Sequence, residues 1–167
     1  MELNYCPVCG TKLYKKYCEN EGDIPFCESC EEFRFPVFST AVSMIALNPS
    51  KDKILLLKQY GNDFFVLPAG YVNKGENAEH AVRREISEEL GVSVKSLYYN
   101  NRSSYFEKSQ TLILNFTAIL ESEELTTDFE VDSFEWFSFA DAKRNVKPDS
   151  LAAHFVNCFV DNNEVIR

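Results

Sequence analysis

The sequence lacks an excess of positive charge. Its 167 residues include 17 Lys and Arg against 26 Asp and Glu, which gives a formal net charge of −9 at pH 7. Phosphate backbones and anionic lipid headgroups attract positive surface, so this balance disfavours broad binding to nucleic acid or to anionic membranes. A local basic patch is still compatible with such a total.

Long apolar runs and an export signal are also absent. No stretch approaches the roughly 20 apolar residues that a membrane-spanning helix needs, and residues 1–6 do not begin a signal peptide. We therefore expect a soluble, cytoplasmic protein without a membrane partner. The sequence shows no internal repeat or low-complexity tract, and a hydrophobic fraction of 45% favours a packed core over disorder.

Four of the six cysteines form two CxxC pairs separated by 17 residues. This spacing is typical of zinc-binding pairs and supplies four thiolates to one tetrahedral, structural Zn²⁺. Nucleic-acid binding by this segment is the alternative, and seven acidic residues within it argue against that use. Cys18 is either a displaced ligand or an ordinary loop thiol. The four paired cysteines are Cys6, Cys9, Cys27 and Cys30.

Phe35-Pro36 marks the joint between two regions, because the residue before a proline favours extended backbone. We expect a zinc ribbon over residues 1–34 and one mixed α and β domain over residues 35–167. Gly91 ends the clearest helix of that domain, in which apolar residues recur at helical spacing. The expected strands are 37–47 and 53–58, which form a hairpin, 64–67, 92–99, 111–120 and 134–137; the expected helices are 77–90, 139–145 and 150–160.

Three carboxylates crowd one flank of the helix over residues 77–90. Glu85, Glu88 and Glu89 fan over roughly 100° of its surface. Such like charges repel by a few tenths of a kcal/mol per exposed pair, and a divalent cation would offset the repulsion. Oxygen ligands select hard ions such as Mg²⁺ or Mn²⁺, and Arg84 is placed to orient a carboxylate. The alternative is a solvated acidic face.

The glycine and charged residues between positions 70 and 92 match every fixed position of the Nudix box. The segment therefore resembles the Nudix hydrolases. This resemblance implies an α+β class fold, an α/β/α sandwich with a mixed sheet, in which a loop-helix-loop binds divalent metal and a water attacks a diphosphate linkage. The matching residues are Gly70, Glu76, Arg84, Glu85, Glu88, Glu89 and Gly91.

The resemblance also implies a role for each box residue. Glu85 and Glu89 would be the principal ligands of the catalytic Mg²⁺ or Mn²⁺. Glu88 and Glu89 are both candidates for the group that activates water, and Arg84 would assist catalysis. The residues expected to shape the loop and end the helix are Gly70, Glu76 and Gly91.

A zinc ribbon ahead of a Nudix box resembles the NADH pyrophosphatase branch of the family. That branch implies two further metal ligands, Glu130 and the main-chain carbonyl of Ala69; an exposed strand-end glutamate is the alternative for Glu130. A proline-rich run should occupy residues 101–109, but every proline is missing there. The missing prolines argue against a rigid platform for a nicotinamide or adenine ring, and stacking of a base on Tyr105 or Phe106 stays open. The implied substrate-binding residues are Phe106, Ser109 and Ala152.

Together these features predict a metal-dependent pyrophosphohydrolase that cleaves the diphosphate linkage of a small nucleoside-diphosphate derivative, such as NADH, NAD or another dinucleotide. Two other functions remain open: a non-catalytic nucleotide sensor or interaction module on the same fold, and a hydrolase of nucleotide-capped RNA. The intact acidic box argues against the first, and the acidic charge balance disfavours the second. The sequence leaves open the number of catalytic metals and the oligomeric state, and a homodimer is one of the states it allows.

Overall fold

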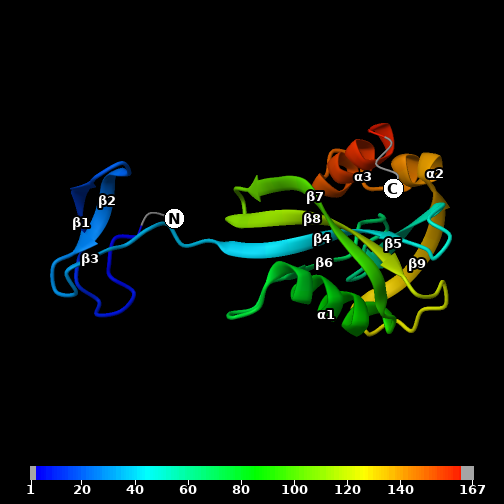
Figure 1. Cartoon of the computed structure of the whole chain (residues 1–167), viewed down its shortest axis with the longest axis horizontal. Helices are drawn as coiled ribbons and strands as arrows, with labels where there is room; N and C mark the ends of the chain where they lie inside the picture. Colours follow the sequence, from blue (N-terminus) through cyan, green and yellow to red (C-terminus); the bar gives the residue numbers. More distant parts are fainter. Residues whose placement is uncertain (1–2, 163–167) are drawn as a thin grey trace. The chain divides into compact units, whose positions relative to one another are not determined.

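The chain folds into two compact units, residues 1–38 and residues 39–167, in a computed structural model that describes residues 3–162 (Figure 1). The boundary expected after residue 34 falls within the last residues of the first unit. No helix in the described part of the chain is both long and apolar enough to cross a membrane.

The first unit is a small antiparallel sheet with very little apolar core. Its buried cluster consists of Leu13 together with Cys6 and Cys27, so the cysteines themselves fill the interior. Too few apolar side chains are present to stabilise such a short segment by burial alone, which is the usual reason for a metal in a small fold. The strands, in the order β1-β2-β3, are β1 (Tyr14–Cys18), β2 (Gly22–Cys27) and β3 (Glu32–Phe33).

The second unit is built on a six-stranded mixed sheet. The strand order is β7-β8-β4-β5-β9, with β6 paired to β4. Only β4 and β8 run parallel, from Ser39↔Thr111 to Leu47↔Ile119, and the other pairs are antiparallel. The strands are β4 (Ser39–Leu47), β5 (Lys53–Gln59), β6 (Ala69–Tyr71), β7 (Val94–Phe106), β8 (Thr111–Leu120) and β9 (Val131–Ser138).

Helices cover both faces of this sheet, with α1 on one face and α2 and α3 on the other (Figure 1). Successive strand residues point to opposite faces, so Met44 packs in the cluster under α1 and Ile45 packs in the cluster under α2 and α3. This arrangement confirms the predicted α/β/α sandwich. The helices are α1 (Ala78–Leu90), α2 (Phe139–Asn145) and α3 (Leu151–Asp161).

Helix α1 begins and ends where the sequence predicts. The side chain of Asn77 accepts a hydrogen bond from the His80 backbone N–H at 2.8 Å and caps the first turn. Gly91 ends the helix in the left-handed conformation, with φ of 62°. The buried residues of α1 are Ala81, Val82, Ile86, Glu89 and Leu90, so the acidic flank begins at the edge of the core with Glu89 and reaches solvent at Glu88.

Two strand predictions need correction. The segment 64–67 forms only isolated bridges, from Val66 to Leu57 and from Phe65 to Val146, before the chain enters the short strand β6. Strand β7 continues to Phe106 rather than stopping at Tyr99, because a register shift between Tyr99 and Arg102 absorbs the Asn-Asn step. Val66 thus bridges to β5, and β6 pairs with β4 a few residues later. The chain then enters the acidic site.

Candidate active site

Gly70 is a glycine because Glu85 lies directly against its backbone. A Cβ added at Gly70 would stand 1.9 Å from Glu85 Cδ and 2.1 Å from Glu85 Oε1, far inside contact distance. Strand β6 therefore provides a cradle that only a residue without a side chain leaves open. The close approach, rather than a tight turn, explains this glycine, whereas Gly91 does end a helix.

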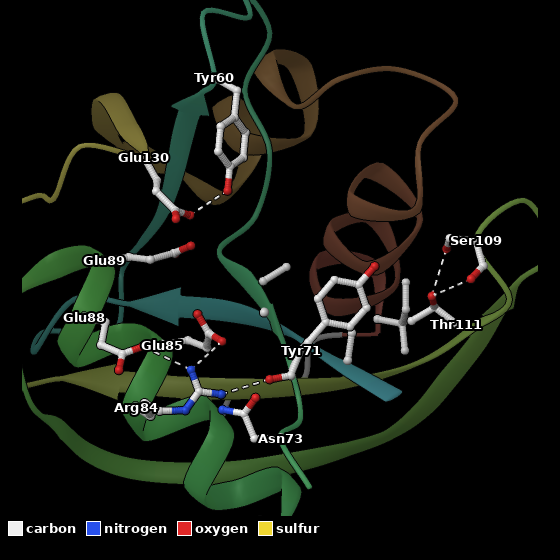
Figure 2. Close-up of a pocket in the computed structure, with 14 residues that line it drawn as sticks. Tyr60, Tyr71, Asn73, Arg84, Glu85, Glu88, Glu89, Ser109, Thr111 and Glu130 are labelled. Carbon is white, nitrogen blue, oxygen red and sulfur yellow. Dashed lines mark hydrogen bonds and ion pairs between the residues drawn. The ribbon is translucent and has the colours of Figure 1, made fainter. Parts of the chain in front are cut away.

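Arg84 connects helix α1 to the loop that precedes it (Figure 2). Its Nη1 donates to Glu85 at 2.7 Å and to Glu88 at 3.0 Å, and its Nε donates to Glu76 at 2.9 Å. Nη2 donates to the carbonyl oxygen of Tyr71 at 2.9 Å. The hydrogen bonds from Arg84 lower the pKa of Glu76 to about 2. Arg84 thus holds three carboxylates in fixed directions.

Glu89 is the most deeply buried carboxylate of the site. It is 4% exposed, and its Oε1 accepts a hydrogen bond from Gln59 Nε2 at 3.1 Å. The other oxygen, Oε2, is buried and finds no hydrogen-bond partner within residues 3–162. Burial raises the pKa of Glu89 to about 7 and also raises the pKa of Glu85. An ionised carboxylate in this position needs a cation to offset its desolvation.

Glu130 comes from the loop before β9 and faces the helix from across the cleft. The hydroxyl of Tyr60 donates to Glu130 Oε2 at 2.5 Å, and this contact raises the pKa of Tyr60 to about 12 (Figure 2). The backbone N–H of Gly61 donates to Asp132 at 2.6 Å, which fastens the turn after β5 to β9. The fold therefore brings together carboxylates separated by about forty residues of sequence.

These residues surround one cleft of about 510 Å³ (Figure 2). Tyr60, Tyr71, Asn73 and Thr111 also line it and were not predicted, because no local pattern distinguishes a cleft aromatic or amide from a surface one. Among the described residues, no three carboxylates bring their oxygens within 4.8 Å of one another. The predicted residues that line the cleft are Ala69, Gly70, Arg84, Glu85, Glu88, Glu89, Ser109 and Glu130.

A second cavity of about 460 Å³ adjoins the cleft, and the two share Ala41, Ala69 and Ile113. Two of the predicted substrate-binding residues, Phe106 and Ala152, line this second cavity. The third, Ser109, lines the adjoining cleft. Its other lining groups include Gln59, Phe64 and Lys147, with Lys147 Nζ 3.8 Å from the centre of the Phe64 ring.

The cysteines of the first unit converge tightly, and their four sulfur atoms all lie within 4.8 Å of one another. The Cys6–Cys30 and Cys9–Cys27 sulfur distances are 3.9 and 3.5 Å. A tetrahedral zinc with Zn–S bonds of about 2.3 Å separates its sulfurs by about 3.8 Å, so the cluster has the right size. Cys18 lies outside this group.

The pKa values of two thiols in this cluster are shifted in opposite directions. Contact with Cys9 and burial raise the pKa of Cys30 to about 12. Burial also opposes ionisation of Cys6, yet hydrogen bonds from the Cys9 backbone and from Arg34 bring its pKa to about 6. Four thiolates this close together need a dication between them, so the donor set fits zinc.

Comparison with known proteins agrees with the box residues and the fold. Residues 37–155 match the family model described as NUDIX domain. The NAD-capped RNA hydrolase NudC of Pseudomonas aeruginosa is 29% identical over 159 residues, covering 93% of this chain and 55% of that protein. The NAD-capped RNA hydrolase NUDT12 of Homo sapiens is 32% identical over 143 residues, covering 80% of this chain and 30% of that protein. This chain thus spans about half the length, or less, of these curated relatives.

Solved structures show the same fold at lower identity. The NUDIX hydrolase from Nitrosomonas europaea superposes with a TM-score of 0.68 at 17% identity, over 96% of this chain and 92% of that one. The NUDIX domain of NrtR from Shewanella oneidensis, complexed with ADP ribose, gives a TM-score of 0.62 at 15% identity, over 83% and 94% of the two chains. The family match covers most of the sequence, and the chain belongs to the Nudix family, as its box residues predict.

Proposed function

We propose that the chain is a divalent-metal-dependent pyrophosphohydrolase that cleaves the diphosphate linkage of a dinucleotide or related nucleoside-diphosphate derivative. The observation that carries this proposal is the Oε2 of Glu89, which is buried beside the cleft that also contains Glu85 and has no hydrogen-bond partner within residues 3–162. A buried carboxylate oxygen without a donor is costly. A hard divalent cation at that position would remove the cost and give the oxygen a use.

The residues of the cleft would have different roles in metal binding. Glu85, Glu89, Glu130 and the carbonyl of Ala69 would hold Mg²⁺ or Mn²⁺, and the bound metal would neutralise phosphate oxygens and lower the pKa of an attacking water. Arg84 keeps Glu85 aligned over the Gly70 cradle.

Two carboxylates can accept the proton of that water. Glu88 is exposed at the cleft and accepts a hydrogen bond from Arg84, and Glu89 is buried with a pKa raised by desolvation. Proton transfer is most efficient when the pKa of the base lies near the working pH. Both residues remain candidates for this role.

The second cavity provides a place for the nucleoside. It is lined mainly by apolar groups, including Phe106 and Ala152, and it opens beside the acidic cleft. Such cavities bind planar, apolar ring systems. A dinucleotide would therefore place its diphosphate against the carboxylates and one base in the second cavity, close to Phe106.

The cysteine cluster would hold one structural Zn²⁺. All four donors are cysteine sulfurs, and a tetrahedral site with four protein ligands has no open position for substrate. The zinc would thus stabilise the first unit and take no part in the reaction.

NAD-capped RNA is the second candidate substrate, favoured by the names of the curated relatives. Its cap contains the same diphosphate linkage as NAD, so the same cleft would serve. The formal charge of −9 gives little general attraction for the RNA body. Small dinucleotides are therefore proposed as the first substrates to test.

The test is a substrate screen on the purified full chain with Mg²⁺ and with Mn²⁺. It includes NADH, NAD, other dinucleotides, nucleotide sugars, nucleoside triphosphates and a short NAD-capped RNA, and it identifies the products by mass. We expect two mononucleotides from a dinucleotide. Binding of these compounds without any product from a folded, metal-loaded protein would instead favour a nucleotide sensor.

A further inference from the structure

Two consecutive residues at the end of β5 donate hydrogen bonds to two different carboxylates of the acidic cleft. Gln59 Nε2 donates to Glu89 Oε1 at 3.1 Å. The Tyr60 hydroxyl donates to Glu130 Oε2 at 2.5 Å (Figure 2). Neither donor belongs to the sequence segment 70–92 that carries the family pattern. Both acceptors belong to the proposed metal-ligand set.

The backbone is bent at this point so that both side chains can reach the cleft. Successive residues of a regular strand point to opposite faces of the sheet, which would direct Gln59 and Tyr60 away from each other. The pairing of β5 with β9 shifts register between Lys58 and Gln59, and Tyr60 adopts a left-handed conformation with φ of 55°. Bulges of this kind re-aim side chains near functional sites.

Further contacts hold the bend in place. The Asn62 side chain donates to the carbonyl oxygen of Gln59 at 2.9 Å, and the Gly61 N–H donates to Asp132 at 2.6 Å. A left-handed tyrosine persists only where its surroundings determine it. The turn after β5 is therefore a fixed support for the two donors rather than a free surface loop.

We infer that Gln59 and Tyr60 are positioning residues for the metal ligands, because each occupies one oxygen of its carboxylate and directs the other oxygen toward the cation. For Glu89 that other oxygen is Oε2, which is buried and has no hydrogen-bond partner in the described part of the chain. Donors that orient ligand carboxylates commonly change metal affinity or activity by about 10-fold to 100-fold when removed. The inference rests on the proposed function, since the cation is the one that the hydrolysis uses.

The Tyr60–Glu130 contact could instead compete with the metal for the same carboxylate. In that case the hydroxyl would have to release Glu130 before the cation binds, and its removal would tighten metal binding. The two mechanisms therefore predict opposite changes in affinity. The direction of the change in a Tyr60→Phe variant separates them.

The experiment measures Mn²⁺ binding to the full chain without substrate, by the electron paramagnetic resonance signal of free Mn²⁺. Tyr60→Phe removes the hydroxyl from a side chain whose residue is 70% exposed, so the core is untouched. We expect the Mn²⁺ Kd to rise about tenfold. Gln59→Met, which removes the amide donor at similar length, should raise it by a similar factor.

The matched control is Tyr71→Phe. Tyr71 lines the same cleft and contacts Arg84 through its backbone carbonyl, so loss of its hydroxyl should leave the Mn²⁺ Kd unchanged. In hydrolysis assays, saturating Mn²⁺ should restore most of the kcat of Tyr60→Phe. A general structural defect would not respond to metal in this way.

An unchanged or lower Kd in Tyr60→Phe overturns the inference, and so does a wild-type protein that binds no Mn²⁺. Failure of the proposed function looks different. If the wild-type protein binds Mn²⁺ but cleaves no phosphoanhydride, and Tyr60→Phe weakens Mn²⁺ binding, the positioning role stands and the hydrolase function does not. If the wild-type protein is active and neither substitution changes its Mn²⁺ Kd, the hydrolase function stands and the positioning role does not.

Discussion

The two sets of candidate metal ligands in this chain are organised in opposite ways. The four cysteine sulfurs lie within 4.8 Å of one another. The three carboxylates proposed as metal ligands in the cleft accept hydrogen bonds from three different residues: Arg84 for Glu85, Gln59 for Glu89 and Tyr60 for Glu130. The sulfurs are spaced for one zinc, whereas no three carboxylates of the described residues bring their oxygens within 4.8 Å of one another.

This difference distinguishes a closed site from an open one. A tetrahedral thiolate site is complete with its four protein ligands. A catalytic Mg²⁺ site keeps positions for water and for phosphate oxygens, so its protein ligands need not converge on their own. Substitutions at the two sites should therefore differ in their effect on hydrolysis, which should be large in the cleft and absent at the cysteines.

Glu89→Gln should have the largest effect. The amide has nearly the same shape, and removal of a buried charge that desolvation disfavours should leave the fold intact. Loss of a metal ligand should lower turnover at least about a hundredfold, because it removes transition-state charge stabilisation. Steady-state kinetics on the substrate identified by the screen, with circular dichroism for the fold, measure this. A folded variant with undiminished turnover would show that Glu89 is not a ligand.

Gly70→Ala should lower turnover by about tenfold to a hundredfold, since a misplacement of about 1 Å in a catalytic group can have this effect. The added methyl would overlap the flexible end of Glu85, which can swing away, so the fold should survive while the ligand is displaced. Gly75→Ala tests backbone strain instead of overlap, because its added methyl meets no heavy atom within 4 Å but its φ of 83° disfavours any residue with a side chain. Undiminished turnover in a folded Gly70→Ala variant would contradict the displacement of Glu85.

Phe106→Ala should have a smaller and substrate-dependent effect. The residue lines the second cavity and is 46% exposed, so it is available to a ring and is not ordinary core. A stacking contact is worth about 0.5 to 1.5 kcal/mol, which corresponds to a loss of about threefold to tenfold in kcat/KM on NADH. A substrate without nicotinamide should be little affected. Equal losses on both substrates would contradict a stacking role.

Cys27→Ser should have no measurable effect on turnover, yet it should abolish zinc binding. Cys27 is fully buried within the cysteine cluster, so its loss removes one of four ligands and much of the small core of the first unit. Elemental analysis should fall from about one zinc per chain to nearly none. Cys158→Ser, on α3 and outside the cluster, should keep the zinc. A large loss of turnover in Cys27→Ser alone would connect the cysteines to the chemistry.

Local patterns predicted the parts of the fold that are locally determined. Helix α1 was predictable because its apolar spacing, its Asn77 cap and its Gly91 stop all agree. Strand β6 was not predicted, because three residues give no measurable periodicity. Residues 64–67 have the composition of a strand, but they form only two isolated bridges, one to Leu57 of β5 and one to Val146 at the end of α2.

The residues of the candidate site likewise differ in whether local sequence could place them. Residues inside the box could be placed from sequence because their spacing along one helix sets their geometry. Gln59 and Tyr60 could not, because they reach Glu89 and Glu130 only through a bulge and pairing between β5 and β9. The true reason for Gly70 was equally hidden, since it is the position of Glu85 in space that requires a glycine.

The parallel pairing of β4 with β8 also has a consequence for how the chain acquires its site. Residues 39–47 pair with residues 111–119, and the whole of α1 lies in the intervening chain. A loop of this length must close before the pair can form, and such distant pairings slow folding. Helix α1 can form early from local interactions alone. Glu130 directly precedes β9, so its place beside the box carboxylates depends on the pairing of β9 with β5, and the complete ligand set of the cleft forms only together with the sheet.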